Sequence, residues 1–173
     1  MFDELSLNIL DIGMNSLAAG ARRIEVSVVE SARHNWLVLR VRDDGRGMDA
    51  ATLKRILSRN ASTKTTRKKS VGLGLALLRQ TAEMCGGTFH IRSTPGKGTS
   101  VTASMRHAHV DRPPLGDLVA TIHALAANPA VDVRLRYRSD EGTFQFSSQE
   151  GKHHEPRRTQ TPEGKSAAAG CAA

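Results

Sequence analysis

Aromatic residues are scarce in this chain, making up 3% of its 173 residues, with one tryptophan and one tyrosine. Single-stranded nucleic acid is usually bound by stacking bases on aromatic side chains. The composition therefore disfavours that function, although the net charge is +8. The chain also lacks an apolar run of about eighteen residues, so we expect no membrane-spanning helix and no association with a membrane.

Cysteine is also rare, and the two present are Cys85 and Cys171. Two such distant cysteines do not form a disulfide framework of the kind found in secreted proteins. The N-terminus carries Asp3 and Glu4 where a signal peptide would be basic. We therefore expect a cytoplasmic protein.

Carboxylates are absent between Ala50 and Ala82, whereas eight cationic side chains lie there. These are Lys54, Arg55, Arg59, Lys64, Arg67, Lys68, Lys69 and Arg79. They surround Gly72 and Gly74, which stand at the start of a predicted helix. Glycine weakens a helix start, but the free N–H groups of a helix N-terminus suit a bulky anion. This pattern favours a polyphosphate site, with an ordinary solvated surface as the alternative.

The apolar residues that are present follow two periods. Helical spacing covers about residues 4–19, 50–59, 72–85 and 118–127, and alternation covers 24–30, 36–44, 88–93, 99–107, 131–139 and 142–148. On the 72–85 helix the predicted apolar side bears Leu73, Leu77, Leu78, Thr81 and Met84. Because the strands come in adjacent pairs, we predict an α+β two-layer sandwich. Its sheet would be mixed and mostly antiparallel, with helices on one face.

The chain divides into three predicted parts. Residues 1–106 would form a nucleotide-binding domain, and residues 107–149 would add a helix and a β-hairpin. Residues 150–173 are polar and then rich in alanine and glycine, which predicts a disordered tail.

Two segments supply polar side chains suited to a nucleotide. "DIGMN" places Asp11 and Asn15 one helical turn apart, where a carboxylate and an amide oxygen can share Mg²⁺ and its waters. "DDGRGMD" ends a strand with Asp43, which can accept a hydrogen bond from an exocyclic amine. The glycines that follow allow the backbone to approach a flat base.

Two further segments are rich in glycine. "VGLGL" at 71–75 offers N–H groups at a helix start, and "GKGTS" at 96–100 closes a turn into a strand. The P-loop and dinucleotide patterns do not fit, because "GLGLALLR" lacks the required lysine and further glycine. Taken singly, each segment also fits an ordinary helix face or turn.

In this order, the four segments resemble the N, G1, G2 and final G-T boxes of the GHKL ATPases, the histidine-kinase-like ATP-binding domains. The resemblance covers about residues 1–106 and implies a Bergerat-type fold with ATP and Mg²⁺ as cofactors. It implies that Asn15 binds Mg²⁺ and that Asp43 accepts from the adenine amine. Thr99 would support Asp43 through its hydroxyl or a water.

The resemblance also assigns Asp11, which could share the metal and act as the catalytic base. The loop from about residue 58 to 71 would be a lid over the nucleotide. The other nucleotide-binding residues implied are Gly45, Gly47, Met48, Lys64, Lys68, Lys69, Gly72, Leu73, Gly74 and Leu75.

The seven histidines all follow Asn15. Histidine kinases carry their phosphoacceptor histidine before the ATP-binding domain, so the resemblance implies that a partner protein supplies the acceptor. The expected function is the ATP module of a phosphotransfer system. Two alternatives are an ATP-gated switch that binds a partner without chemistry and, less favoured, nucleic-acid binding. The oligomeric state is left open.

Overall fold

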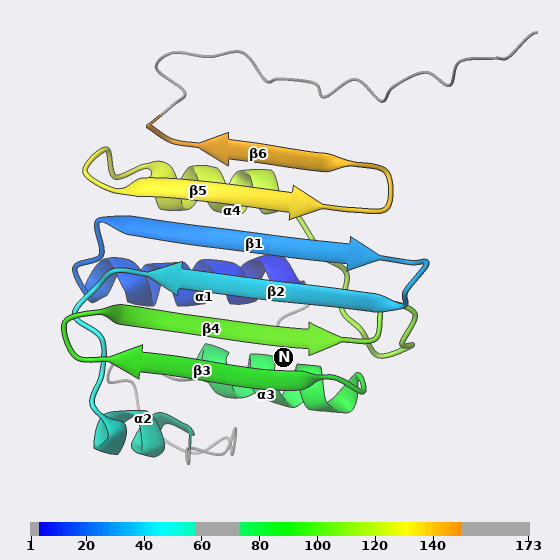
Figure 1. The fold of residues 1–173 in the computed structure, drawn as a ribbon, viewed down its shortest axis with the longest axis horizontal. Helices are drawn as coiled ribbons and strands as arrows, with labels where there is room; N and C mark the ends of the chain where they lie inside the picture. The colour runs from blue at the N-terminus through cyan, green and yellow to red at the C-terminus, as the bar shows by residue number, and fades with distance from the viewer. Residues whose placement is uncertain (1–3, 58–72, 150–173) are drawn as a thin grey trace, which may run out of the picture.

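A computed structural model describes residues 4–57 and 73–149. Its centre is a six-stranded sheet with the order β3-β4-β2-β1-β5-β6 (Figure 1). The strands are β1 (Arg23–Ser31), β2 (Trp36–Asp43), β3 (Thr88–Thr94), β4 (Gly98–Met105), β5 (Asp132–Arg138) and β6 (Thr143–Ser147). β1 and β5 run parallel, and the other neighbouring pairs are antiparallel. The prediction of a mixed, mostly antiparallel sheet is confirmed.

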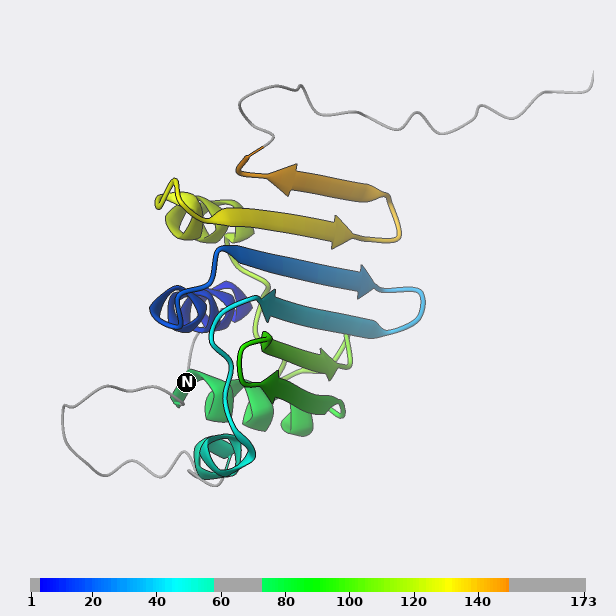
Figure 2. The same cartoon turned by 60° about the vertical axis from the view of Figure 1, so that its left-hand side comes forward.

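Helices form the second layer, on one face of the sheet. Figures 1 and 2 show α1 (Leu5–Ala18), α3 (Leu73–Met84) and α4 (Leu118–Ala126) on the same side. The short helix α2 (Ala50–Leu57) lies beside β3 and contacts α3. This arrangement confirms the predicted α+β sandwich. Within the described ranges, no helix is long and apolar enough to cross a membrane.

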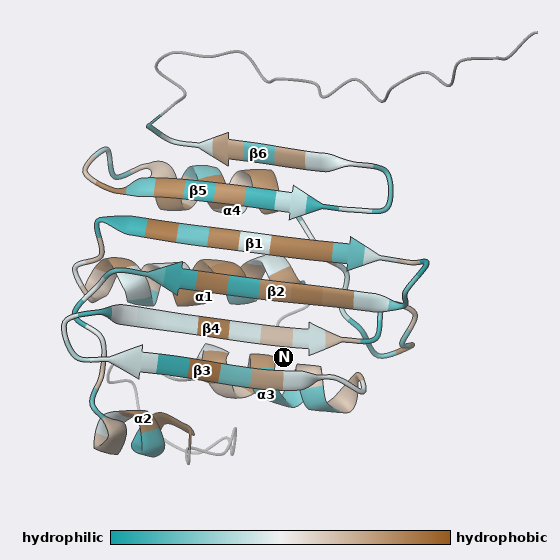
Figure 3. Cartoon of the chain, in the orientation of Figure 1, coloured by the Kyte–Doolittle hydropathy of each residue, from teal (hydrophilic) through white to brown (hydrophobic). Residues whose placement is uncertain are grey.

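Strand alternation determines which face the helices cover. Figure 3 shows hydrophobic and hydrophilic residues alternating along β1 and β2. Ile24, Val26 and Val28 of β1 are buried and belong to the core with Leu5 and Ile9 of α1. Successive strand residues point to opposite faces, so the intervening residues lie on the face without helices.

Residues 107–149 extend this same sheet. β5 pairs with β1 in a register that joins Ile24 to Val133. α4 packs on α1 so closely that a Cβ at Gly13 would press against the Leu125 side chain. The connector before α4 is tied to the start of α1, where the N–H of Leu5 donates to the carbonyl of Pro114 at 3.0 Å. The C-terminal helix and hairpin therefore share one core with the preceding residues.

The buried side of α3 differs in part from the prediction. Met84 is 49% exposed, so its assignment to the apolar side was wrong. Leu78 and Thr81 are buried as predicted. The buried apolar residues of this helix are Leu75, Leu78, Ala82 and Cys85. Their spacing of three and four residues follows one helical face, and position 84 lies about 100° from position 85 around the helix axis.

Candidate functional site

Asp43, the last residue of β2, is a buried carboxylate held from three directions. Its side chain is at one edge of the sheet and the residue is 8% exposed. Oδ1 accepts the backbone N–H groups of Gly45 at 2.9 Å and Thr99 at 3.2 Å. Oδ2 accepts the hydroxyl of Ser16, on α1, at 2.9 Å. These contacts fix the orientation of the carboxylate relative to both layers.

The two oxygens of Asp43 differ in remaining capacity. A carboxylate oxygen accepts about two hydrogen bonds. Among the described residues, Oδ1 has two donors and Oδ2 has one. Oδ2 is therefore the oxygen that can accept from a further donor, such as an exocyclic amine.

Thr99 contacts Asp43 through its backbone. The backbone N–H of Thr99 donates to Asp43, while its hydroxyl lies 2.9 Å from the Ser93 hydroxyl. Ser93 Oγ also accepts the N–H of Met48 at 2.8 Å. The serine thus connects the turn after β2 to the turn between β3 and β4.

Two glycines allow these turns to pack together. Gly47 has a φ of +64°, and a Cβ there would overlap the carbonyl of Thr94. Gly98 has a φ of +85°, and a Cβ there would overlap the carbonyl of Asp43. Positive φ angles and such close backbone contacts favour glycine. The turn that follows Asp43 is held in place by these contacts.

A second polar group lies on α1. Asn15 Nδ2 donates to Asp11 Oδ2 at 3.2 Å. Burial raises the pKa of the Asp11 carboxyl, although the hydrogen bond from Asn15 acts in the opposite direction. At the start of α3, a Cβ at Gly74 would overlap the Asp11 carboxylate. The close approach of α3 to Asp11 therefore explains why glycine occupies position 74.

Helix α1 connects these two groups. Asn15 contacts Asp11, and the next residue, Ser16, contacts Asp43. A molecule bound along α1 would have the Asp11 carboxylate near one of its own ends and the Asp43 carboxylate near the other. The structure thus brings Asp11, Asn15 and Gly74 together, and it places Asp43 with Thr99 nearby on the same side of the sheet.

The remaining predicted site residues are placed as follows. Lys64, Lys68, Lys69, Gly72 and the side chain of Leu73 lie outside the described residues. The Leu75 side chain is buried in the core. Gly45 and Gly47 lie in the turn after Asp43, and Met48 is half-buried and packs against the core.

Three residues that shape the site are not predicted by the sequence, namely Ser16, Ser93 and Asp44. Asp44 Oδ1 accepts the backbone N–H groups of Arg22 and Arg23, each at 2.8 Å. Slight burial raises the pKa of the Asp44 carboxyl, but these hydrogen bonds and the nearby Arg23 charge outweigh it and lower the pKa. The turns around β1 and β2 are joined in this way. The adjacent aspartates "DD" were the available signal for Asp44, whereas the serines have no local pattern.

Comparison with known proteins identifies the family. A family model described as "Histidine kinase-, DNA gyrase B-, and HSP90-like ATPase" matches residues 1–109. The sensor histidine kinase DcuS of Escherichia coli K12 is 39% identical over 72 residues, which are 42% of this chain and 13% of that protein. ZraS, a sensor histidine kinase of the same strain, is 31% identical over 100 residues, which are 58% of this chain and 21% of that protein. The chain therefore spans about a fifth or less of the length of these relatives.

A solved structure shows the same fold. It is described as the crystal structure of the N-terminal domain of a DNA repair protein, and its TM-score is 0.51 at 14% sequence identity. The likeness covers 83% of this chain and 51% of the other. Together with the family match over more than half of the residues, the geometry of the site leads to one conclusion. The chain belongs to the histidine kinase-, DNA gyrase B- and HSP90-like ATPase family, and its ATP-binding domain is of the histidine-kinase-like class.

Proposed function

We propose that this chain binds ATP with Mg²⁺ and serves as the ATP module of a cytoplasmic phosphotransfer system, with the phosphoacceptor on a partner protein. The observation that carries the proposal is the pairing of two sites along α1. Asp43 with Ser16 suits the base, and Asp11 with Asn15 beside Gly74 suits the phosphates and their metal.

The donor set of the second site fits Mg²⁺. Carboxylate and amide oxygens are ligands that this ion prefers, and it usually keeps several waters and phosphate oxygens. Across residues 4–57 and 73–149, no cluster of three or more His, Cys, Asp or Glu could hold a metal without other ligands. We infer that Asn15 and Asp11 supply the few protein ligands. When bound, Mg²⁺-ATP would supply the phosphoryl group and neutralise part of its charge.

Asp11 is the proposed catalytic base. Its carboxylate would orient the attacking hydroxyl and accept its proton. Burial, which raises the pKa of Asp11, makes the group a stronger base. An aspartate reaches less far than a glutamate, so slow turnover in the absence of a partner is expected.

Three variants of α1 test this assignment. Asp11→Asn should slow the release of labelled phosphate from ATP while calorimetric affinity for Mg²⁺-ATP stays about the same, because the amide oxygens of the introduced asparagine and of Asn15 can both still bind the metal. Asn15→Ala should reduce both affinity and hydrolysis. Met14→Ala, at an exposed position of the same helix, is the control and should change neither.

Three results would contradict the proposal. Failure of the purified protein to bind Mg²⁺-ATP would remove the nucleotide site altogether. Unchanged hydrolysis in Asp11→Asn would remove Asp11 from the chemistry. Strong labelling of the protein on its own histidine would contradict an acceptor on a partner.

A second candidate function is an ATP-gated switch that binds a partner without phosphoryl transfer. The contact between Gly74 and Asp11 favours it, because a ligand at Asp11 would bear directly on the start of α3. The two functions differ in one measurement. A partner captured in the presence of ATP acquires labelled phosphate in the first case and remains unlabelled in the second.

A further inference from the structure

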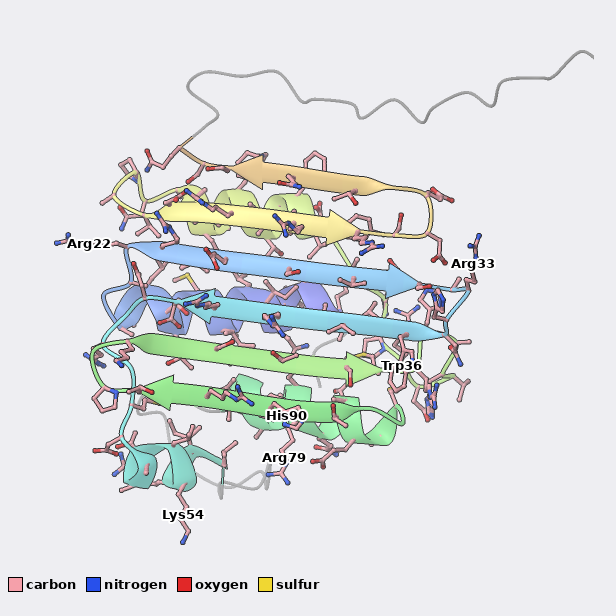
Figure 4. All side chains as sticks on the ribbon, viewed as in Figure 1. Arg22, Arg33, Trp36, Lys54, Arg79 and His90 are labelled. Carbon is pink, nitrogen blue, oxygen red and sulfur yellow. The ribbon has the colours of Figure 1, made fainter. Side chains whose placement is uncertain are left out.

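The sheet face opposite the helices is rich in arginine. Alternation along four strands places seven exposed arginines on it, which we call the arginine face. They are Arg23, Arg40, Arg42, Arg92, Arg134, Arg136 and Arg138. Figure 4 looks onto this face, with exposed His90 labelled on β3. The nucleotide site proposed above lies on the other side of the same sheet.

Strand register arranges these side chains in rows. One row runs from Arg92 through Ser100, Arg42 and Glu25 to Arg134. The next runs from His90 through Thr102, Arg40 and Ser27 to Arg136 and Gln145. Neighbouring strands lie about 4.8 Å apart, so the arginines of a row recur about every 10 Å. Ser100, Thr102 and Ser27 stand between them, and Glu25 separates Arg42 from Arg134.

Most of this positive charge is not neutralised within the described ranges. Only two carboxylates of the described strands lie on the arginine face, Glu25 and Asp132. Asp132 pairs with Arg23 at 3.3 Å and with Arg134 at 2.8 Å. No ion pair is found there for Arg40, Arg42, Arg92, Arg136 or Arg138, and Arg40 donates instead to the Thr102 hydroxyl at 3.2 Å.

Part of the face is hollowed. Beside the turn between β3 and β4 lies a shallow hollow. Its lining includes Arg42, Arg92, Lys97 and Ser100, together with Asp43, Ser93, Thr94, Gly98 and Thr99 of the neighbouring candidate site. Three cationic residues therefore border one small space, against the single carboxylate residue Asp43. Guanidinium groups form strong, paired hydrogen bonds with carboxylates, and this makes the hollow suited to an acidic side chain.

Three observations favour a protein over a nucleic acid. Glu25 lies between Arg42 and Arg134, where it would repel a continuous phosphate backbone. Apolar surface adjoins the arginines, since Val29 is 39% exposed and pairs with Val38. The Arg106 guanidinium lies 4.1 Å from the centroid of the Trp36 ring and covers one face of it, which is therefore closed to base stacking.

We propose that the arginine face docks an acidic surface of a partner protein. Carboxylates of the partner pair with the unneutralised arginines, one of them in the hollow, and an apolar side chain covers Val29 and Val38. Docking along the arginine rows does not require ATP, because these side chains lie on the sheet face opposite the helices and Asp11. The hollow is the one part of the docking surface that Asp43 also lines. The docking goes beyond the proposed ATP-dependent function, and either can fail without the other.

Charge-matched variants test the proposal. The open-face variant combines Arg42→Gln, Arg92→Gln and Arg136→Gln. The margin variant removes the same charge through Arg22→Gln, Arg33→Gln and Lys54→Gln, at positions that Figure 4 shows around the edge of the molecule. The probe is a labelled peptide of repeated Glu-Glu-Val-Glu, followed by fluorescence anisotropy at physiological salt, with duplex DNA of similar charge as the second arm.

The open-face variant should bind the peptide about tenfold more weakly than the wild type, and the margin variant should change by about twofold or less, since each exposed pair contributes modestly. Equal losses in the two variants would show attraction by net charge alone and overturn the proposal. It would also be overturned if the wild type did not bind the peptide, or if DNA bound more tightly through the same arginines.

A second measurement uses the unaltered protein and does not depend on how the variants fold. The Nε–Hε resonances of arginine report directly on guanidinium contacts. Adding the peptide to ¹⁵N-labelled protein should shift those of Arg42, Arg92 and Arg136 and leave Arg22 and Arg33 nearly unchanged. The reverse pattern would contradict docking on this face. Repeating the titration with Mg²⁺-ATP should give the same affinity.

Discussion

Replacing Asp43 with asparagine should change which purine the protein prefers. In the folded protein, Oδ1 accepts two backbone N–H groups and Oδ2 accepts the Ser16 hydroxyl. The amide oxygen of asparagine can take the place of Oδ1. The amide NH₂ then replaces Oδ2, and Ser16 can accept from it while donating to the Ile12 carbonyl, which lies 3.1 Å away. The local hydrogen bonds therefore survive the substitution.

The binding of adenine should not survive it. The NH₂ group of the introduced asparagine would face the exocyclic amine of adenine, donor against donor. Loss of a charge-assisted hydrogen bond costs about 2 kcal/mol, which is about thirtyfold in affinity for ATP. Inosine triphosphate carries an oxygen at the same position of the ring and would accept from the amide. In Asp43→Asn the affinity for ATP should fall while the affinity for inosine triphosphate is maintained or rises. The ratio of the two affinities should thus fall by more than the roughly thirtyfold loss for ATP alone.

Isothermal titration calorimetry with each nucleotide and Mg²⁺ measures this ratio for the wild type and for Asp43→Asn. Circular dichroism and thermal unfolding of both proteins provide the control for folding. Equal weakening of both nucleotides would show that Asp43 does not face the base edge. An unchanged ATP affinity would refute the assignment of Asp43 to the nucleotide altogether.

Three further predictions concern stability. Gly74→Ala should lower the free energy of unfolding by about 1–3 kcal/mol in urea titrations, because the new Cβ meets the Asp11 carboxylate. The control Gly142→Ala places its Cβ in open space and should change the free energy of unfolding by about 0.5 kcal/mol or less. Stabilisation by Gly74→Ala would contradict the close packing of α3 on Asp11. Ser16→Ala should lower the free energy of unfolding by about 1–3 kcal/mol, because Oδ2 of the buried Asp43 loses its hydroxyl donor. An unaltered midpoint of urea unfolding would count against that hydrogen bond. The pKa of Asp44 is lower in the folded protein than in the unfolded chain, where it is near 4. The charged carboxylate therefore stabilises the fold at pH values above the unfolded pKa. This stabilisation is lost as the pH falls through the folded pKa. Asp44→Asn should therefore melt at a lower temperature than the wild type at neutral pH, and the difference should shrink in acid; a difference independent of pH would refute the role of the charge.

Much of the fold can be predicted from local pattern. Ile24, Val26 and Val28 alternate with polar residues because one face of β1 is buried, and this alternation predicts a strand. The parallel pairing of β1 with β5 cannot be predicted in this way. It joins Ile24 to Val133, and it depends on the packing of α4 against α1. Burial of Cys85 rather than Met84 on α3 likewise depends on how the helix is rotated against the sheet.

The candidate site likewise contains some residues that the sequence predicts and others that it does not. Asp43 and Asn15 are predictable because their residue types and their places beside glycines or on a helix face suit recognised chemistry. Ser16 is not, since a serine inside a helix has no signature until β2 brings Asp43 to it. The contact of Thr99 through its backbone also depends on turn geometry, which the side chain does not encode.

Strand β2 carries Arg42 and Asp43 as consecutive residues that face opposite sides of the sheet. A point mutation at either position changes a side chain on one face of the sheet, so the two faces can diverge largely independently during evolution, except at the hollow that both residues line. Insertion or deletion of one residue inside β2 would instead turn every following side chain to the other side and place a guanidinium in the cradle built around Asp43. Lineages of this protein should therefore vary β2 by substitution while its length remains constant.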